Sequence, residues 1–451
     1  KLFKNKTDSF VITGSCTSRG VLIMANEVEI LDAIMGSNKT NGIIKWMDNH
    51  PNEKYIYISP LLSEVTYGSR LDTDVKNIKF EFPSVDDEYK TKGEQLLNML
   101  QNGCNIGATH SLYLSMTDRH LDVIEQQGYV ILADEEVNAI TKFDKYSYDD
   151  LDYLLLKKDI KISEVDGMLS WVGVDLGQRN KYRHFADMCD NKMIYSAKRD
   201  KAMMVTQLPI RLFTCAKRVI IMTYMFDGNI LDCFLRLKGI KVKKFTEVKP
   251  TPISKKDIRS LITLLPLDDK VSKLNQTNTG YGKMTQAQLD EIGKYITRVA
   301  RRYDIDSKDV LFTLPKNIFE PSKKSHKRIR PKGYSFYKEY VFDKDGNAVY
   351  DKNSKHKTVE KPCWLYAGCR ATNEYSNTWL LFHCYDRHPN TAVASYLADY
   401  GYAPKLNVFR CSEITQWIFR SRIRKSLPIV LAITNEKMYN VFTNWLNNDE
   451  I

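Results

Sequence analysis

The segment Ala33–Thr40 contains the residue types that bind phosphate groups in proteins. It reads Ala-Ile-Met-Gly-Ser-Asn-Lys-Thr, follows the apolar run Val28–Asp32 and precedes a helical pattern over residues 42–47. The amides of such a loop and the helix N-terminus attract anions, the lysine can reach the outer phosphates, and the threonine hydroxyl can ligate Mg²⁺. This spacing predicts a nucleoside-triphosphate site formed by Gly36, Ser37, Asn38, Lys39 and Thr40.

Asn38 departs from the usual form of this loop, which has glycine before the lysine. Asparagine is the residue other than glycine that most readily adopts left-handed backbone angles, so we expect the loop to form with Asn38 in place. Its side chain can crowd the phosphates or slow turnover. An ordinary turn before a helix is the alternative explanation when this stretch is considered alone.

Two carboxylates follow another buried strand. The apolar run Gly128–Ala133 ends in Asp-Glu-Glu-Val at residues 134–137. A phosphate loop needs a carboxylate at the tip of a neighbouring strand to hold Mg²⁺, and a group beside it to orient water. We predict the first role for Asp134 and the second for Glu135. The alternative is a pair of acids at a helix N-terminus, where the helix dipole favours them.

A third group of polar residues lies near the C-terminus, in the segment 412–424. Helical spacing places Gln416, Arg420 and Arg424 on one face of a helix, each four residues from the next. Such a face can contact a terminal phosphate presented by another domain, as an arginine finger does. A solvated basic face, or one that faces nucleic acid, is the alternative. The apolar residues 417–419 predict that this helix is buried on its other side.

In this order the motifs resemble those of superfamily-two helicases, and the first two resemble the form found in the DEAD/DEAH group. The amino-acid sequence at residues 370–375 and 416–421 is most similar to that of helicase-like replication proteins of bacteriophages. Those proteins are distantly similar to viral origin-binding helicases. The resemblance extends from about Val28 to Trp445. Further segments that resemble helicase motifs are residues 57–61, 107–112, 219–224, 309–315 and 364–375.

The resemblance implies two tandem RecA-like domains that bind ATP and Mg²⁺ between them and move along a single strand as they close and open. The metal would be held by Thr40 and Asp134. The catalytic residues would be Lys39, Asp134, Glu135, Gln416, Arg420 and Arg424. Contacts with the strand are expected from Ser59, Pro60, Thr109, His110, Arg370, Thr372 and Asn373.

Three features depart from the family pattern. Asn38 replaces the glycine of the loop, and Phe419 stands where the sixth motif has glycine, with the second arginine shifted to Arg422 or Arg424. The coupling motif keeps only Thr223 of its usual Ser-Ala-Thr. These departures bear on the rate of ATP hydrolysis more than on the fold.

The segment 322–361 combines basic and aromatic residues. A basic run is followed by tyrosines and Phe336, and the remainder predicts a hairpin with a turn at residues 345–346, between residues 340–342 and 348–350. Basic residues suit phosphate contacts and aromatic residues suit base stacking, as in the hairpin insertions that helicase second domains often carry. A charged surface loop is the alternative. Expected nucleic-acid contacts here are Lys323, Lys324, Lys327, Arg328 and Arg330.

Strand and helix patterns alternate along the chain, which predicts an α/β fold with parallel sheets flanked by helices. The Lys-Pro-Thr-Pro breaker at residues 249–252 predicts a boundary between domains 1–249 and 250–451, the second carrying the basic hairpin. A charged helical stretch, residues 144–167, is expected to pack outside the first sheet. A helix over residues 285–303 is expected to lead into the strand at Val310.

Composition is consistent with a protein that contacts polyanions. The chain has 451 residues, enough for two or more domains, and a formal net charge of +12, which favours a nucleic-acid partner. We expect DNA more than RNA, with replication proteins as further partners. No apolar run approaches the length of a membrane span and no signal peptide is visible, so we expect a cytoplasmic protein (in the host cytoplasm if viral) with no membrane partner.

The nine cysteines are scattered and contain no Cys-x-x-Cys pair, which disfavours both a disulfide framework and a zinc site. Cys363 and Cys369 with His383 could form a metal site, but buried thiols in strands are the simpler interpretation.

Three functions agree with these motifs. The first is an ATP-dependent nucleic-acid helicase or translocase in phage-type replication. The second is a helicase-like binding or loading factor with weak or no ATPase activity. The third is a packaging motor, which would need a carboxylate-rich nuclease domain where residues 363–451 instead offer arginines.

Overall fold

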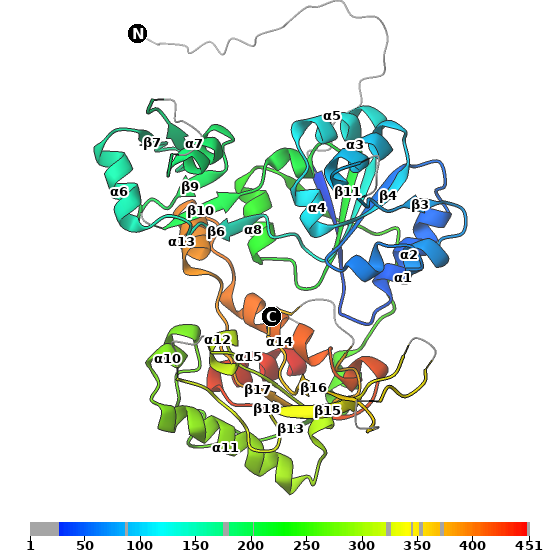
Figure 1. Ribbon diagram of the computed structural model, residues 1–451, viewed down its shortest axis with the longest axis vertical. Coiled ribbons are helices and arrows are strands. Elements are labelled where there is room, and N and C mark those ends of the chain that lie inside the picture. The colour runs from blue at the N-terminus through cyan, green and yellow to red at the C-terminus, as the bar shows by residue number, and fades with distance from the viewer. Residues whose placement is uncertain are drawn as a thin grey trace, which may run out of the picture.

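The computed structural model describes residues 27–85, 89–174, 180–201, 203–321, 326–343, 346–350, 355–369 and 374–448. Two parallel β-sheets lie at its centre, one in each half of the chain, and helices flank both sheets (Figure 1). This confirms the predicted α/β fold with parallel sheets. The boundary at residues 249 and 250 stays a prediction.

The first sheet consists of seven parallel strands, which are β1 (Glu27–Asp32), β2 (Tyr55–Ser59), β3 (Phe80–Glu81), β4 (Asn105–Thr109), β5 (Val130–Asp134), β11 (Arg218–Thr223) and β12 (Lys241–Lys244). Their order is β12-β1-β11-β5-β2-β4-β3. Alternate residues of a strand point to opposite faces. In β1, Val28 and Ile30 join one buried cluster and Leu31 joins another. Because both faces are apolar, helices must cover both.

Apart from the short 3-10 turn η1 (Leu62–Glu64), which has no buried residue, the helices that flank this sheet contribute side chains to the same two clusters. Ile43 and Met47 of the helix after β1 pack on one face, and Leu96 and Phe234 lie on the other. The elements are α1 (Lys39–Asp48), η1 (Leu62–Glu64), α2 (Arg70–Thr73), α3 (Lys92–Gln101), α4 (His110–Leu114), α5 (Asp118–Gln127), η2 (Ile210–Phe213) and α8 (Ile230–Leu237).

A small lobe is inserted between β5 and β11. Its elements are β6 (Ile140–Lys142), α6 (Tyr148–Leu156), β7 (Ile160–Ile162), β8 (Leu169–Trp171), α7 (Arg183–Asp190), β9 (Ile194–Ser196) and β10 (Met204–Gln207). It has its own buried cluster, which includes Phe143, Leu154 and Phe185 and no residue of the seven-stranded sheet. The expectation that residues 144–167 pack outside that sheet is therefore wrong, because their apolar side chains build a separate lobe (Figure 1).

The second sheet has four parallel strands, which are β13 (Ile262–Leu264), β14 (Val310–Thr313), β17 (Leu380–His383) and β18 (Ile429–Ile433). Their order is β13-β18-β17-β14, and Val310 and Phe312 face one cluster while Leu311 faces the other. The predicted helix at 285–303 and strand at Val310 are confirmed. The flanking elements are α9 (Lys255–Ser260), α10 (Asn278–Lys283), α11 (Gln286–Arg302), η3 (Ser307–Asp309), α12 (Lys316–Phe319), α14 (Leu406–Ile418), η4 (Arg422–Lys425) and α15 (Glu436–Asn447).

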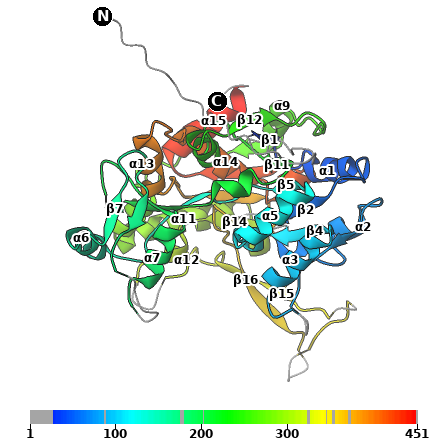
Figure 2. The same ribbon diagram turned by 90° about the horizontal axis from the view of Figure 1, so that it is seen from above.

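Two antiparallel strands, β15 (Phe336–Tyr340) and β16 (Thr358–Pro362), lie within the segment 322–361. They project from the body of the molecule (Figure 2). Phe342 forms a bridge with Ala348, as the predicted turn requires. The predicted pairing of residues 340–342 with residues 348–350 is wrong for Tyr340, which pairs with Thr358 instead. The longer antiparallel ladder is the one that β15 forms with the later strand β16.

One helix of the second half packs on the first. The helix α13 (Thr391–Asp399) places Val393, Tyr396 and Leu397 in the buried cluster that also contains Val28 and Phe234. The two halves are therefore joined by a shared core as well as by the chain connection at residues 245–254. No helix among the described residues is both long enough and apolar enough to cross a bilayer.

Candidate functional site

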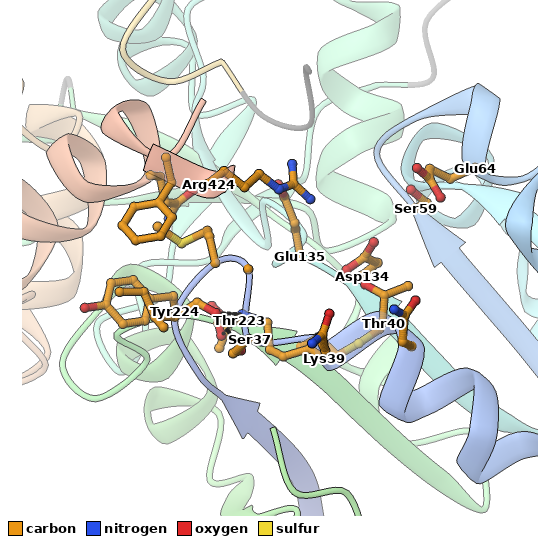
Figure 3. Close-up of a pocket in the computed structure, with 18 of the residues that line it drawn as sticks. Ser37, Lys39, Thr40, Ser59, Glu64, Asp134, Glu135, Thr223, Tyr224 and Arg424 are labelled. Carbon is orange, nitrogen blue, oxygen red and sulfur yellow. Dashed lines mark hydrogen bonds between the residues drawn. The ribbon is translucent and has the colours of Figure 1, made fainter. Parts of the chain in front are cut away.

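A cavity of about 330 Å³ lies where the two halves meet at the carboxyl end of the first sheet. Figure 3 shows Lys39 and Thr40 from α1, Asp134 and Glu135 from the end of β5, and Arg424 from the second half around it. Ligand pockets commonly lie at this end of parallel strands and have volumes of about 300–1,000 Å³. Other predicted residues that line it are Gly36, Ser37, Asn38, Ser59, Gln416 and Arg420.

The loop before α1 contains two residues in the left-handed backbone conformation. Gly36 has a φ of 81° and Asn38 a φ of 60°, so both adopt left-handed angles. The expectation that Asn38 can take the conformation usually given to glycine is confirmed. The helix α1 begins at Lys39, so the amides of its first turn point toward the cavity, where they attract an anion.

Lys39 lies across the base of this loop. Its Nζ donates to the carbonyl oxygens of Ala33 and Thr223, the latter at 3.1 Å. Burial lowers the pKa of Lys39 to about 8, although Asp134 and other nearby carboxylates act in the opposite direction. An anion in the cavity would raise this pKa again and favour the charged form.

Asp134 and Glu135 lie two strands away from the loop of residues 33–40, because β11 lies between β1 and β5. Burial, followed by the charge of Glu135, raises the pKa of Asp134 to about 6. A bound cation would reverse this penalty, which suits a metal ligand. Glu135 has a φ of 70°, a costly angle for a residue other than glycine or asparagine, and its amide donates to Met222 O at 3.1 Å.

The third residue of the Asp-Glu-Glu sequence, Glu136, connects two segments of the site. It accepts hydrogen bonds from the hydroxyl of Thr223 and from Asn229 Nδ2, the latter at 2.6 Å. Thr223 is the one residue that the sequence retains from the coupling motif. Glu136 and Asn229 were not assigned roles from the sequence, since only the folded chain brings them together.

Gln416, Arg420 and Arg424 all line the cavity, but they do not share one helix. The predicted helix over residues 412–424 is wrong in extent, because α14 ends at Ile418 and Arg424 belongs to η4. Arg420 Nη2 lies 3.6 Å from Glu135 Oε1 across the boundary between the halves. The Arg420 side chain is 7% exposed, and its Nε has no hydrogen-bond partner among the described residues.

The cavity is also lined by a second charged pair, which was not predicted from the sequence. Arg70 in α2 lies 3.2 Å from Glu64 in η1, and it donates to Asn41 Oδ1 at 3.2 Å. Both belong to a polar stretch without any phosphate-binding motif, so no local signal distinguishes them. Burial, then the charges of Arg420 and Arg70, lower the pKa of Arg424 from its ordinary value.

The predicted nucleic-acid residues fall into two described groups. Ser59 lines the cavity beside Pro60, the Thr109 side chain caps α4, and His110 Nε2 lies 3.1 Å from Asp134 O. On the second half, Lys327 Nζ donates to Gly282 O at 2.8 Å.

Arg330 extends this second group, since its guanidinium lies 4.2 Å from the centre of the Phe319 ring. The Arg328 amide donates to Gln286 Oε1 at 3.2 Å. Lys323, Lys324, Arg370, Thr372 and Asn373 lie outside the described residues. Within the described part of the chain, no cluster of three or more His, Cys, Asp or Glu side chains is arranged to hold a metal ion.

Comparisons with known proteins concern the second half most directly. Residues 256–446, from α9 to α15, match a family model described as the YonV C-terminal Rossmann-like domain. A protein of Bacillus subtilis strain 168, described as "SPbeta prophage-derived uncharacterized protein YonV", is 28% identical over 432 residues, which are 93% of this chain and 99% of that protein. The chain is thus similar to a prophage-derived protein over nearly its whole length, and its second half is Rossmann-like.

Proposed function

We propose that this protein is an ATP hydrolase whose nucleotide site lies between its two halves. One observation carries the proposal: the phosphate loop, two strand-end carboxylates and two arginines from the other half line a single cavity. A triphosphate with a metal ion is the ligand class that needs cations, carboxylates and helix-end amides together.

The side chains that line the cavity fit ATP and Mg²⁺. Lys39, Arg420 and Arg424 are cationic. The buried N–H group at Arg420 Nε has no acceptor among the described residues, which is energetically costly, and a bound polyanion would provide one. Thr40 and Asp134 would hold Mg²⁺, since they offer the hard oxygen ligands that this ion prefers.

Each residue can be given a role in hydrolysis. Lys39 and the loop amides bind the phosphates, and Glu135 orients and deprotonates the attacking water. Arg420 reaches Glu135 across the boundary and stabilises charge that develops on the transferred phosphoryl group. When bound, the Mg²⁺ ion supplies charge neutralisation between the phosphates. Glu136, through Thr223, connects the strand-end carboxylates to the neighbouring strand.

We further propose that the two halves act as tandem RecA-like domains of a helicase or translocase, with DNA as the favoured polymer. The net charge of +12 and the aromatic residues Phe336, Tyr337 and Tyr340 of the projecting strand β15 support a nucleic-acid partner. The prophage origin of the YonV relative supports a role in phage-type replication.

Nucleotide binding tests the phosphate site directly. We expect Lys39→Ala to weaken binding of a fluorescent ATP analogue with Mg²⁺ by at least about tenfold, because a charged hydrogen bond contributes about 1.5–3 kcal/mol. Lys45→Ala, on the exposed face of the same helix, is the matched control and should bind like the parent protein. Equal binding by both variants would refute the site.

The second candidate is a helicase-like binding or loading factor with weak or no hydrolysis. Asn38 in the loop favours it, since its side chain lies where the usual form has none. Stimulation of ATP turnover by DNA separates the two candidates. A packaging motor ranks third, because the second half contributes arginines to the cavity rather than a carboxylate cluster.

A further inference from the structure

The segment 248–253, here called the strap, connects the two halves and is hydrogen-bonded to the phosphate loop. The Thr251 amide donates to Ser37 O at 2.8 Å. Asn38 Nδ2 donates to Thr251 Oγ1 at 3.2 Å. The residue that replaces the loop glycine therefore uses its side chain to contact the strap.

Apolar contacts add to these hydrogen bonds. A Cβ atom built on Gly36 would lie 3.7 Å from Ile253 Cδ1, and one on Gly42 would lie 2.5 Å from Val248 Cγ1. Real Cβ atoms do not approach a neighbour as closely as the second distance. The strap thus lies directly against the loop and the first turns of α1, and only glycine at position 42 leaves it room.

The strap leads without interruption into the second half. Ser254, the next residue, caps α9 by accepting a hydrogen bond from the Lys256 amide at 3.1 Å. The helix α9 packs against α15, whose Trp445 is buried in the same cluster as Phe419. A displacement of the phosphate loop can therefore reach the elements that carry Arg420.

We propose that Asn38 is a positioning residue that couples occupancy of the phosphate loop to the strap, and through it to the second half. This inference rests on the proposed nucleotide site. The Asn38 backbone does what glycine does in other loops, since its φ is 60°, while its amide group makes a contact that glycine cannot make. The replacement of glycine by asparagine at position 38 therefore adds a connection between the phosphate loop and the strap.

Hydrogen exchange of the full chain measures this coupling, because the Thr251 amide lies between two prolines and can be resolved from its neighbours. Pro250 and Pro252 have no amide hydrogen, so Thr251 has the one exchangeable amide between Lys249 and Ile253, and a peptide of residues 249–252 reports on it. With a saturating non-hydrolysable ATP analogue and Mg²⁺, we expect exchange at Thr251 to slow in the parent protein. The variants to compare are Thr251→Val, Asn38→Gly and, as the conservative control, Thr251→Ser.

Loss of one hydrogen bond should reduce the nucleotide-dependent slowing by roughly fivefold in Thr251→Val and Asn38→Gly, and the Thr251→Ser hydroxyl should restore it. The combined variant should lose no more than either alone, as expected for two partners in one contact. The same slowing in Thr251→Val as in the parent would overturn the coupling. Failure of the parent to bind the analogue, measured separately by fluorescence, would overturn the nucleotide site and the coupling together.

Discussion

At the scale of single residues, Glu135 combines a costly backbone conformation with a position at the centre of the site. Its φ of 70° places its carboxylate beside Asp134 and within 3.6 Å of Arg420. Strained residues persist where the surrounding structure over-determines them, and here the Glu135 amide is held by Met222 O. This geometry supports Glu135, rather than Glu136, as the group that acts on water.

Glu135→Gln should therefore lower the ATP hydrolysis rate by about 10²–10⁴-fold while ATP binding changes little, because an amide keeps the shape but cannot accept a proton. Initial rates at saturating ATP, with a binding titration alongside, check this. Glu164→Gln, an exposed position in the small lobe, should hydrolyse ATP like the parent. An unchanged rate in Glu135→Gln would move the catalytic role elsewhere.

The residues predicted from the sequence are those whose chemistry is encoded locally. Gly36, Asn38 and Lys39 share one loop, so their spacing alone indicates a phosphate site. Glu64 and Arg70 could not be found in this way, since they reach the cavity through the fold and have no motif of their own. The same holds for the contact between Glu136 and Thr223, which lie 87 residues apart.

At the scale of elements, the close contact between α1 and the strap makes a specific stability prediction. Gly42→Ala should destabilise the protein by about 1–3 kcal/mol, because its Cβ would meet Val248 at 2.5 Å in a packed region. Gly282→Ala in α10 is the matched control, since its Cβ meets nothing within 4 Å, and it should be neutral or stabilising by up to about 1 kcal/mol. Urea unfolding of both variants measures the difference, and equal effects would contradict the packing.

The strand β17 ends in a buried histidine that should give the fold a pH dependence. Burial lowers the pKa of His383 from 6.5 to about 3, and neither ring nitrogen has a hydrogen-bond partner among the described residues. The unfolded chain binds a proton below about pH 6.5 and the folded chain does not. The contribution of the neutral His383 side chain to the free energy of unfolding is thus fully present above pH 6.5. It falls by about 1.4 kcal/mol per pH unit as the pH drops toward 3.

His383→Leu removes the titrating group and keeps an apolar side chain of similar size. We expect the free energy of unfolding to decline less steeply between pH 6.5 and pH 4 in this variant, with a change of less than about 1.5 kcal/mol at pH 7. Urea titrations across this range provide the curves. Parallel curves for the variant and the parent would show that His383 is protonated in the folded protein.

Periodic elements were predictable, whereas their ends and partners were less so. The strands at Val28, Val130 and Val310 follow from apolar runs bounded by turn residues. The early end of α14 does not, because the Ser421 hydroxyl bonds Ile418 O at 2.7 Å and competes with helical hydrogen bonding. The pairing of Tyr340 with Thr358 joins strands separated by an intervening hairpin, and the alternation of apolar residues does not show which later strand β15 will pair with.

At the scale of the whole molecule, the projecting strands and the positive charge make a prediction about nucleic acid. Phe342 is 57% exposed beyond the end of β15, and Tyr340 stacks on His356 with ring centres 4.4 Å apart. Phe342→Ala should weaken single-stranded DNA binding by about tenfold or more, because a stacked base contributes about 1–3 kcal/mol.

Fluorescence anisotropy at a fixed salt concentration measures this affinity, since salt itself changes it strongly. Tyr153→Ala, which removes an exposed aromatic ring from the small lobe, is the control and should bind like the parent. Equal losses in the two variants would indicate a general effect on the protein. No loss in Phe342→Ala would remove the projecting strands from the proposed nucleic-acid surface.

The arrangement of the lobes could not be derived from the sequence. The small lobe depends on which apolar residues find one another, and residues 144–167 contain enough charge to suggest a surface helix. The return of α13 to the first half is also invisible locally, since Tyr396 would suit the core of either half. Both results concern contacts between parts of the chain that are distant in sequence, and the periodicity of apolar residues does not predict such contacts.

The central claim is that residues from both halves form one ATP-hydrolysing site. Steady-state ATP hydrolysis, with and without single-stranded DNA, tests it most directly in the parent protein and in the Lys39→Ala and Arg420→Ala variants. We predict a rate that rises several-fold with DNA and is lost in both variants, one from each half. Hydrolysis that survives in Arg420→Ala, or an absence of hydrolysis in the parent protein while DNA binding is intact, would contradict the claim.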